Sequence, residues 1–212
     1  MNFDIKDLPY AQFEKLGLNR KGVLNMKPED LAAMLSGNRT SLLTFSVELT
    51  NGQRFETDAK LSLFRNPDNS LSLNVHPVRA QIKNDIGATP EEMEKLKTGG
   101  LLVRDHIALN GEREPHYFQL DRETNEILRA RVRDFIVPSA IKDVVLSPDQ
   151  KEQLRQGNVL EIKSKGGDEI IRARVDLNEP RGFTTKPEVL GQSESRGVGG
   201  SAEEVKPTGP RR

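Results

Sequence analysis

The sequence contains three histidines, His76, His106 and His116, and a histidine can serve as a metal ligand or as a general base at neutral pH. A metal site needs further ligands at short, defined spacings, and none of the three stands at such a spacing from another histidine or from a carboxylate pair. The sequence has no cysteine, which removes thiolate ligands and cysteine nucleophiles. We therefore predict no metal and no cofactor, and structural or surface roles for the histidines.

Other residue types that carry out catalysis occur in the sequence, but they form no recognisable catalytic motif. No serine lies in a nucleophile elbow, and no glycine-rich loop carries the lysine and hydroxyl of a phosphate-binding loop. The carboxylate pairs at residues 91–92 and 203–204 are adjacent in sequence, so they cannot face one another across a substrate. We predict that the protein is not an enzyme; the remaining enzymatic alternative is a cleft built from His106, His116 and acids of different segments.

Arginines recur at alternate positions in two segments. They are Arg129, Arg131 and Arg133 in one segment, and Arg172 and Arg174 in the other. Because side chains alternate between the two faces of a strand, each set would lie on one sheet face and could contact DNA phosphates. Interspersed acids, few aromatic residues and a net charge of zero favour a solvated face with cross-strand ion pairs instead.

Near the N-terminus, Tyr10, Phe13 and Leu16 fall on one face of a predicted short helix that starts near Asp7 and ends at Gly17. We expect this apolar face to pack on the helix predicted at residues 28–37. The functional alternative is that the three residues form a docking surface for a partner protein.

The elements that must position these residues come from a predicted repeat. Residues 28–37, 90–99 and 148–157 align without gaps, and their prolines stand 62 and then 58 residues apart. Proline suits the first helical position, and the acid after it suits the positive end of the helix dipole. The final glycine suits the residue just after a helix, which adopts a left-handed backbone conformation and ends the helix. Each segment therefore predicts a helix of about two turns.

Helix caps and inward positions follow the same alignment. Thr89 and Ser147 precede two of the prolines and predict capping boxes with Glu92 and Gln150, whereas Lys27 breaks this pattern in the first copy. The apolar residues expected to point inward are Met34, Leu96 and Leu154.

Behind each glycine, apolar and polar residues alternate, which predicts short antiparallel strands. Asn51-Gly52 and Asn110-Gly111 are strong hairpin signals. The predicted strands cover residues 43–49, 55–63 and 71–75 in the first unit, 101–109, 117–121 and 127–136 in the second, and 159–163 and 170–177 in the third.

Composition limits the class of protein. Apolar residues make up 34% of the 212, so part of the chain must lie outside any core. Neither a secretory signal nor an apolar segment long enough to span a membrane is present, which predicts a soluble cytoplasmic protein without a membrane partner. The predicted division is an N-terminal helix plus first repeat at 1–87, a second repeat at 88–145, a third, shortened repeat at 146–183, and a disordered tail at 184–212.

Residues 8–18, 35–40 and 118–125 resemble uncharacterised domains of unknown function from Bacteroidetes, which are encoded on conjugative transposons and related mobile elements. The segments 146–150 and 154–157 look like a second domain type of the same group, and the resemblance covers roughly residues 5 to 182. It implies a cytoplasmic accessory protein of a mobile element, near DNA. That family offers no catalytic residues to transfer.

Together these observations predict an α+β protein of three diverged repeats, each a short helix followed by a small antiparallel β-meander. The leading functional hypothesis is a non-catalytic protein-interaction or adaptor module with an unknown protein partner. The alternative is a DNA-associated accessory factor that uses the arginine-rich sheet face. The sequence does not predict the oligomeric state.

Overall fold

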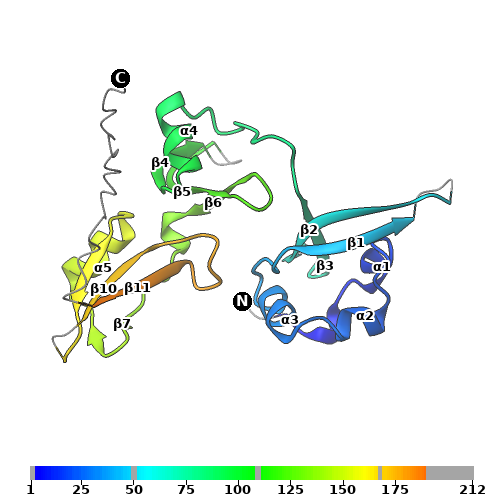
Figure 1. Cartoon of the computed structure of the whole chain (residues 1–212), viewed down its shortest axis with the longest axis horizontal. Helices are drawn as coiled ribbons and strands as arrows, with labels where there is room; N and C mark the ends of the chain where they lie inside the picture. Colours follow the sequence, from blue (N-terminus) through cyan, green and yellow to red (C-terminus); the bar gives the residue numbers. More distant parts are fainter. Residues whose placement is uncertain (1–2, 49–51, 108–110, 167–168, 190–212) are drawn as a thin grey trace, which may run out of the picture.

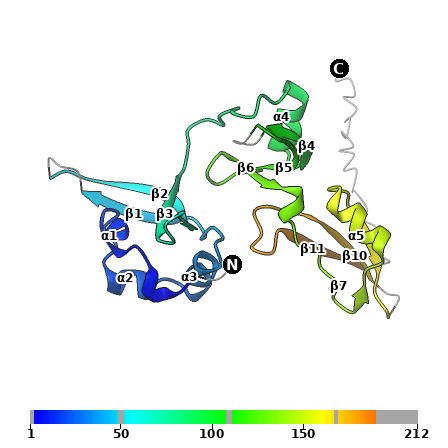
Figure 2. The ribbon, with the colours of Figure 1, turned by 180° about the vertical axis from the view of Figure 1, so that it is seen from behind.

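The computed structural model describes residues 3–48, 52–107, 111–166 and 169–189. Within this part of the chain it shows short helices, three three-stranded antiparallel sheets and a two-stranded hairpin, so the fold class is α+β. We call residues 3–78 the first unit, 79–137 the second unit and 138–189 the third unit. Figures 1 and 2 show them from opposite sides as three lobes along the chain.

The first unit packs its helices on one face of a sheet (Figure 1). Ala59, Leu61 and Leu63 of the middle strand point into that core, and Lys60 and Ser62 alternate with them on the opposite face. The elements are η1 (Ile5–Asp7), α1 (Tyr10–Glu14), α2 (Arg20–Leu24), α3 (Pro28–Leu35), β1 (Leu43–Glu48), β2 (Arg54–Arg65) and β3 (Leu71–Pro77).

The N-terminal helix is shorter than predicted, because α1 ends at Glu14, and α2 was not predicted at all. Helix α1 packs on α2 and β3 and shares one apolar core with Met34 of α3. Gly17 follows α1 with a φ of +77°, and a Cβ there would lie 2.7 Å from the carbonyl oxygen of Ser46. Only glycine allows this close approach of the turn to β1.

In the second unit the central strand is covered on both faces. Phe118 and Leu120 join the core under α4, whereas Tyr117 packs on the opposite face against the third unit. The elements are α4 (Pro90–Lys97), β4 (Leu102–Ile107), β5 (Arg113–Asp121), β6 (Glu126–Arg131) and η2 (Val132–Asp134), with sheet order β4-β5-β6.

The third unit corrects the predicted tail and the predicted length of the third repeat. A strand at Phe183–Val189 pairs along the whole of its neighbour, so residues 184–189 are sheet and the third sheet has three strands. In this strand, polar residues separate the β-branched and aromatic residues, so the sequence shows no regular strand alternation there. The remainder of the predicted tail lies outside the described residues. The elements are β7 (Ala140–Ile141), β8 (Val144–Val145), α5 (Pro148–Arg155), β9 (Leu160–Lys163), β10 (Glu169–Val175) and β11 (Phe183–Val189).

The division at residue 145 also differs from the packing. Ile141 and Val144 of the β7–β8 hairpin pack into the core beneath the third sheet, together with Leu146. The hairpin therefore belongs structurally to the third unit, although the sequence-based boundary placed it with the second.

Helices α3, α4 and α5 begin and end as predicted. Each starts at its proline, Thr89 and Ser147 close capping boxes, and Lys27 makes no side-chain cap. The glycines that follow have φ values of +80°, +85° and +81°, and the residue after each glycine donates its N–H to a carbonyl five residues back. The inward residues Met34, Leu96 and Leu154 are all fully buried.

The predicted hairpin turns are described only in part. Gly52 and Gly111 have φ values of +79° and +82°, which suit their hairpin positions, while Asn51 and Asn110 lie outside the described residues. The described helices include none with the length and apolar character that crossing a membrane requires.

Candidate functional site

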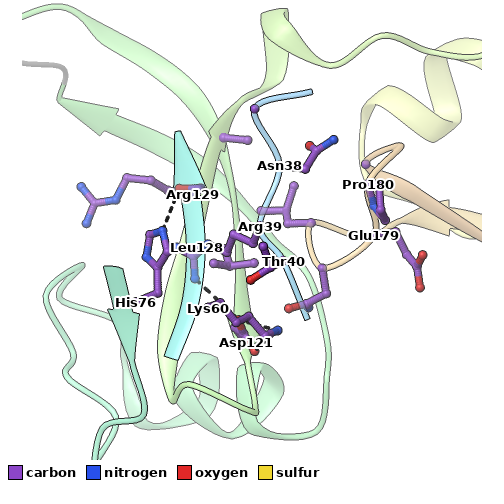
Figure 3. A pocket seen from close by; sticks show the side chains of 16 residues that line it. Asn38, Arg39, Thr40, Lys60, His76, Asp121, Leu128, Arg129, Glu179 and Pro180 are labelled. Carbon is purple, nitrogen blue, oxygen red and sulfur yellow. Dashed lines mark hydrogen bonds and ion pairs between the residues drawn. The ribbon is translucent and has the colours of Figure 1, made fainter. Parts of the chain in front are cut away.

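A cavity of about 390 Å³ lies where the three units meet (Figure 3). Ligand sites in proteins typically have volumes of this order. The first unit contributes the α3–β1 connection and the outer face of its sheet, the second unit contributes β6 and the end of β5, and the third contributes the turn before β11. The lining consists of residues 37–40, 128–130, 177–180 and 182, with Lys60, Ser62, His76 and Asp121.

Lys60 and Asp121 form the most buried ion pair of this junction. Strand alternation in β2 turns Lys60 away from its own core, and the turn after β5 covers it, so the two residues are only 7% and 1% exposed. Lys60 Nζ lies 3.0 Å from Asp121 Oδ2 and 2.7 Å from Glu123 Oε2. Burial opposes ionisation of Asp121, but the hydrogen bond and charge of Lys60 outweigh it and hold the pKa of Asp121 below its usual range.

A second charged group surrounds Glu126 at the start of β6. Arg39 Nη1 lies 2.8 Å from Glu126 Oε2 and 3.6 Å from Asp121 Oδ2, so one guanidinium serves both acids. Burial again raises the pKa of Glu126, yet the charge and hydrogen bond of Arg39 lower it further, and the net shift is downward.

His76 on β3 completes this group and is held at both ring nitrogens. Its Nδ1 lies 3.1 Å from Glu126 Oε2 and its Nε2 lies 2.9 Å from Ser62 Oγ. Burial and the charge of Arg39 lower the pKa of His76, so the ring is neutral at pH 7. A carboxylate accepts only, and we therefore assign the proton to Nδ1, with Ser62 donating its hydroxyl to Nε2.

Two hydrogen bonds hold the same turn to Arg79, the residue directly after the first unit. The N–H of Arg79 donates to the carbonyl of Thr124 at 3.0 Å, and the amide of Asn125 donates to the carbonyl of Arg79 at 2.7 Å. Asn125 adopts a φ of +54°, a left-handed conformation that asparagine tolerates well. Asp121 Oδ1 accepts the N–H of Glu123 at 3.1 Å, so this aspartate also shapes the turn that carries it.

This arrangement binds two units to each other, and its groups are occupied in doing so. Arg39, Lys60, Asp121 and Glu126 neutralise one another, and His76 has a partner at each nitrogen. Among the described residues, no cluster of three or more histidine, aspartate or glutamate side chains could hold a metal ion.

The first arginine segment does not form the predicted stripe. Strand β6 ends at Arg131 and the chain turns into η2, so Arg133 leaves the sheet face that Arg129 and Arg131 share. Arg129 pairs with Asp85 at 3.2 Å, and Arg131 pairs with Asp134 at 2.7 Å.

Arg133 pairs with Glu114 at 3.2 Å. Cross-strand and local ion pairs therefore neutralise all three guanidiniums of this segment, as expected for a solvated face.

The second arginine segment does lie on one sheet face. Arg172 and Arg174 of β10 both point away from the third core, and Arg172 stands opposite Glu161 on one side and Lys186 on the other. Arg172 Nε donates to Glu161 at 2.8 Å, and Arg174 lies 3.8 Å from Asp176. The two arginine segments belong to different sheets.

The apolar N-terminal residues serve the first core. Phe13 is fully buried, and Tyr10 and Leu16 are partly buried against the same cluster. The Tyr10 hydroxyl donates to the carbonyl of Ile5, and the guanidinium of Arg20 lies 4.9 Å above its ring. The three residues thus pack into the core that Met34 of α3 also joins, although the elements directly against α1 are α2 and β3, and Phe13 is not accessible for docking.

The structure brings His106 and His116 together, with ring centroids 5.2 Å apart in an edge-to-face arrangement. Arg129 lies 3.3 Å from His106 Nε2, and partial burial together with this arginine lowers the pKa of His106. The hydrogen bonds and ion pairs described for the two rings are with residues of the second unit.

Sequence reasoning missed the side chains at the cavity, namely Arg39, Lys60, Asp121 and Glu126. Alternation along β2 does place Lys60 on the outer face, but an outward lysine normally lies in solvent. The four residues are separated by up to 87 positions, and nothing local marks them as partners. Only their burial in the folded chain reveals the cluster.

Comparison with known proteins adds limited information. No curated protein and no solved structure shows significant similarity to the chain. Residues 3–86 match a family described as "Protein of unknown function (DUF4099)", which corresponds to the first unit and the connection to the second. The expected resemblance to an uncharacterised domain family is therefore confirmed for this segment, which is less than half of the chain.

Proposed function

We propose that this chain is a non-catalytic protein-interaction or adaptor module. The observation that carries the proposal is the junction around the cavity, where the ionisable groups pair with one another across two units. A catalytic acid or base needs a polar atom that can exchange a proton with a substrate. The ionisable groups of this junction instead form ion pairs and hydrogen bonds that join the two units. What this architecture offers a ligand is a shaped surface assembled from three units.

Affinity capture tests the proposal. The full-length chain is immobilised, proteins from the producing cell are captured, and each enriched protein is purified and titrated against the chain by calorimetry. We expect at least one partner that binds the purified chain with a defined stoichiometry. If no enriched protein binds in the purified system, or if the chain instead turns over a small molecule, the proposal is wrong.

The three units support a proposal of shared origin. Helices α3, α4 and α5 have the same length, the same proline start and the same glycine stop, and each is followed by a three-stranded antiparallel sheet. We infer that the units are diverged copies of one helix-plus-meander element. Units of this size bury little apolar surface alone, which explains why they share junctions.

The setting is also a proposal. The resemblance of the sequence to domains of mobile elements supports an accessory role in such an element, in the cytoplasm. Deleting the gene should lower the transfer frequency of the element that carries it, and complementation should restore it. An unchanged frequency would argue against this setting.

A second candidate, a DNA-associated accessory factor, is favoured by the outer face of the third sheet. Lys163, Arg172, Arg174 and Lys186 share this face with a single acid of β9, Glu161, and Arg172 stands between Glu161, with which it pairs, and Lys186. Like charges placed opposite each other destabilise a sheet, and a polyanion would relieve the repulsion.

Fluorescence anisotropy with duplex DNA at two salt concentrations separates this candidate from the adaptor. The double variant Arg172→Ala with Arg174→Ala should weaken binding at low salt at least five-fold. The matched control, Arg129→Ala with Arg131→Ala, removes two arginines from a different sheet and should bind like the wild type. Absence of binding at low salt, or an equal loss in both variants, would rule the candidate out.

A further inference from the structure

Strand β6 is an edge of the second sheet, and that edge opens into the cavity. Leu128, Arg129 and Ala130 all line the cavity although they are consecutive. Side chains of consecutive strand residues point to opposite faces, so three in a row can line one space together only along the edge of the strand. The edge of a strand carries its outward N–H and C=O groups.

These outward groups are without partners in the described structure. No backbone or side-chain hydrogen bond joins the main chain of residues 128–130 to any described residue outside the second sheet. The Arg129 side chain does not fill the space either, because its guanidinium binds Asp85 and His106 and points away from the cavity cluster (Figure 3). Main-chain polar groups in a recess normally find partners.

Both edges of the first sheet are protected in ways that β6 is not. On β3, the side chain of Gln12 accepts the N–H of Leu73 at 2.8 Å, and Pro77 has no N–H to offer. On β1, the turn at Gly17 lies against the carbonyl of Ser46. These are common means of blocking unwanted strand pairing. The β6 edge differs from both edges of the first sheet in this respect, and among the edges of the second and third sheets it is the one whose residues line the cavity.

We propose that the β6 edge at residues 128–130 binds an extended segment of a partner polypeptide by strand addition. The proposal rests on the proposed adaptor function and names its binding site. A stretch of about three residues spans roughly 10 Å as a strand, which matches the length of edge available. Alternate side chains of the segment enter the cavity, where Lys60 and Asp121 already neutralise each other. The geometry therefore selects uncharged polar or small side chains.

Strand addition makes a specific demand on the ligand backbone that can be tested with the protein intact. A random dodecapeptide library displayed on phage is panned on the full-length chain, and recovered peptides are measured by fluorescence anisotropy. Each recovered peptide is then resynthesised with one N-methyl group at each position in turn. We expect at least a ten-fold loss of affinity at alternate positions and little change at the positions between. A loss without this alternation overturns the proposal.

Matched variants of the protein locate the site. Asn38→Trp places a large side chain in the cavity wall just after the stop of α3, while Asn158→Trp makes the same change at the corresponding position after α5, outside the cavity lining. Peptide affinity should fall at least ten-fold in the first variant and stay unchanged in the second. Circular dichroism establishes that both variants fold, and amide exchange in the wild type should show peptide-dependent protection at residues 128–130.

Other outcomes decide between this site and the wider function. If a captured protein partner binds Asn38→Trp as tightly as the wild type, the adaptor function stands and the β6 site is wrong. Competition of inorganic phosphate with the peptides would instead assign the cavity to an anion, and a dimer abolished by Asn38→Trp would assign it to a second copy of the chain; either result overturns the proposal. If neither peptides nor protein partners bind, both proposals fall.

Discussion

The second unit contacts the first unit through charged side chains and the third unit through an apolar cluster flanked by neutral hydrogen bonds. At the first junction, Lys60 and Asp121 form a buried ion pair. At the second, Tyr117, Leu154 and Val175 are buried together, and the ring of Phe135 lies edge-on to Tyr117 at 5.7 Å. No described apolar cluster joins the first unit to the second.

This difference predicts different responses to solution conditions. Burial of apolar surface depends little on salt or on moderate pH, whereas ion pairs weaken when their acids are protonated and when salt screens them. The second and third units should therefore behave as one body. The first unit is attached by contacts that can be released without loss of either core.

The largest effect is expected from Tyr117→Ala, which should lower the free energy of unfolding by about 4 kcal/mol. The ring fills the apolar junction, and the hydroxyl donates to the carbonyl of Arg155. Urea unfolding measures the loss, and amide exchange should show that α5 and β10 loosen while the first unit does not. The control Tyr117→Phe removes only the hydrogen bond and should cost about 1 kcal/mol. Equal losses in the two variants would contradict an apolar junction.

Lys60→Ala should cost about 3 kcal/mol, because it leaves Asp121 buried with only the more distant Arg39 as a cationic partner. The double variant Lys60→Met with Asp121→Leu removes both charges and should recover most of this loss. Amide exchange should show the first unit separating from the second while α5 stays protected. A single variant as stable as the wild type would mean that solvent already screens the pair. Lys186→Ala, on an exposed strand position, is the matched control and should change stability by less than about 0.5 kcal/mol.

Gly157→Ala should be more destabilising than Gly37→Ala, by roughly 1 kcal/mol. Both glycines stop a helix with a φ near +80°, so both variants carry the same backbone strain. A Cβ at Gly157 would also lie 2.8 Å from Val103 and 2.9 Å from Leu101, whereas a Cβ at Gly37 meets Phe3 at 3.5 Å, an ordinary contact. Thermal unfolding of the two variants measures the difference. Equal shifts would show that the apolar junction adjusts freely around α5.

The smallest effect is expected from pH, and it should have opposite signs at the two junctions. The pKa of His76 is lowered from 6.5, so the unfolded chain binds the extra proton first, and the stability that His76 contributes to the first junction is lost as pH falls below 6.5. Asp121 and Glu126, whose pKa values are also lowered, add to this loss at lower pH.

At the second junction, burial raises the pKa of Tyr117 from 10.0 to about 12, so stability is lost as pH rises from 10 towards 12.

The acid response of the first junction can be measured by small-angle scattering, because the radius of gyration should increase when the first unit separates at pH 5. His76→Gln should flatten the response between pH 7 and pH 5. An unchanged slope in that variant would assign the response to the carboxylates.

Local chemistry allowed much of the secondary structure to be predicted. The starts and stops of α3, α4 and α5 follow from residues within one helical turn of each end, such as Thr89 with Glu92. Strands with regular alternation, such as β2, were also found. The strand prediction failed where the structure depends on a neighbouring segment. Strand β11 is polar in sequence and forms because β10 supplies the backbone groups with which it pairs. Strand β6 ends earlier than predicted because the chain turns into η2 at Val132.

The sequence by itself determined the boundaries of α3, α4 and α5, the α+β class and the faces of the long strands, because these depend on hydrogen bonds and alternation over a few residues. Only the tertiary structure decided what covers each face. An outward lysine in β2 becomes a buried ion-pair partner because a turn 61 residues later lies on it. The open edge of β6 and the paired state of Arg129 likewise depend on distant segments. Contacts between units are set by the shape and charge of surfaces that exist only after each unit has folded.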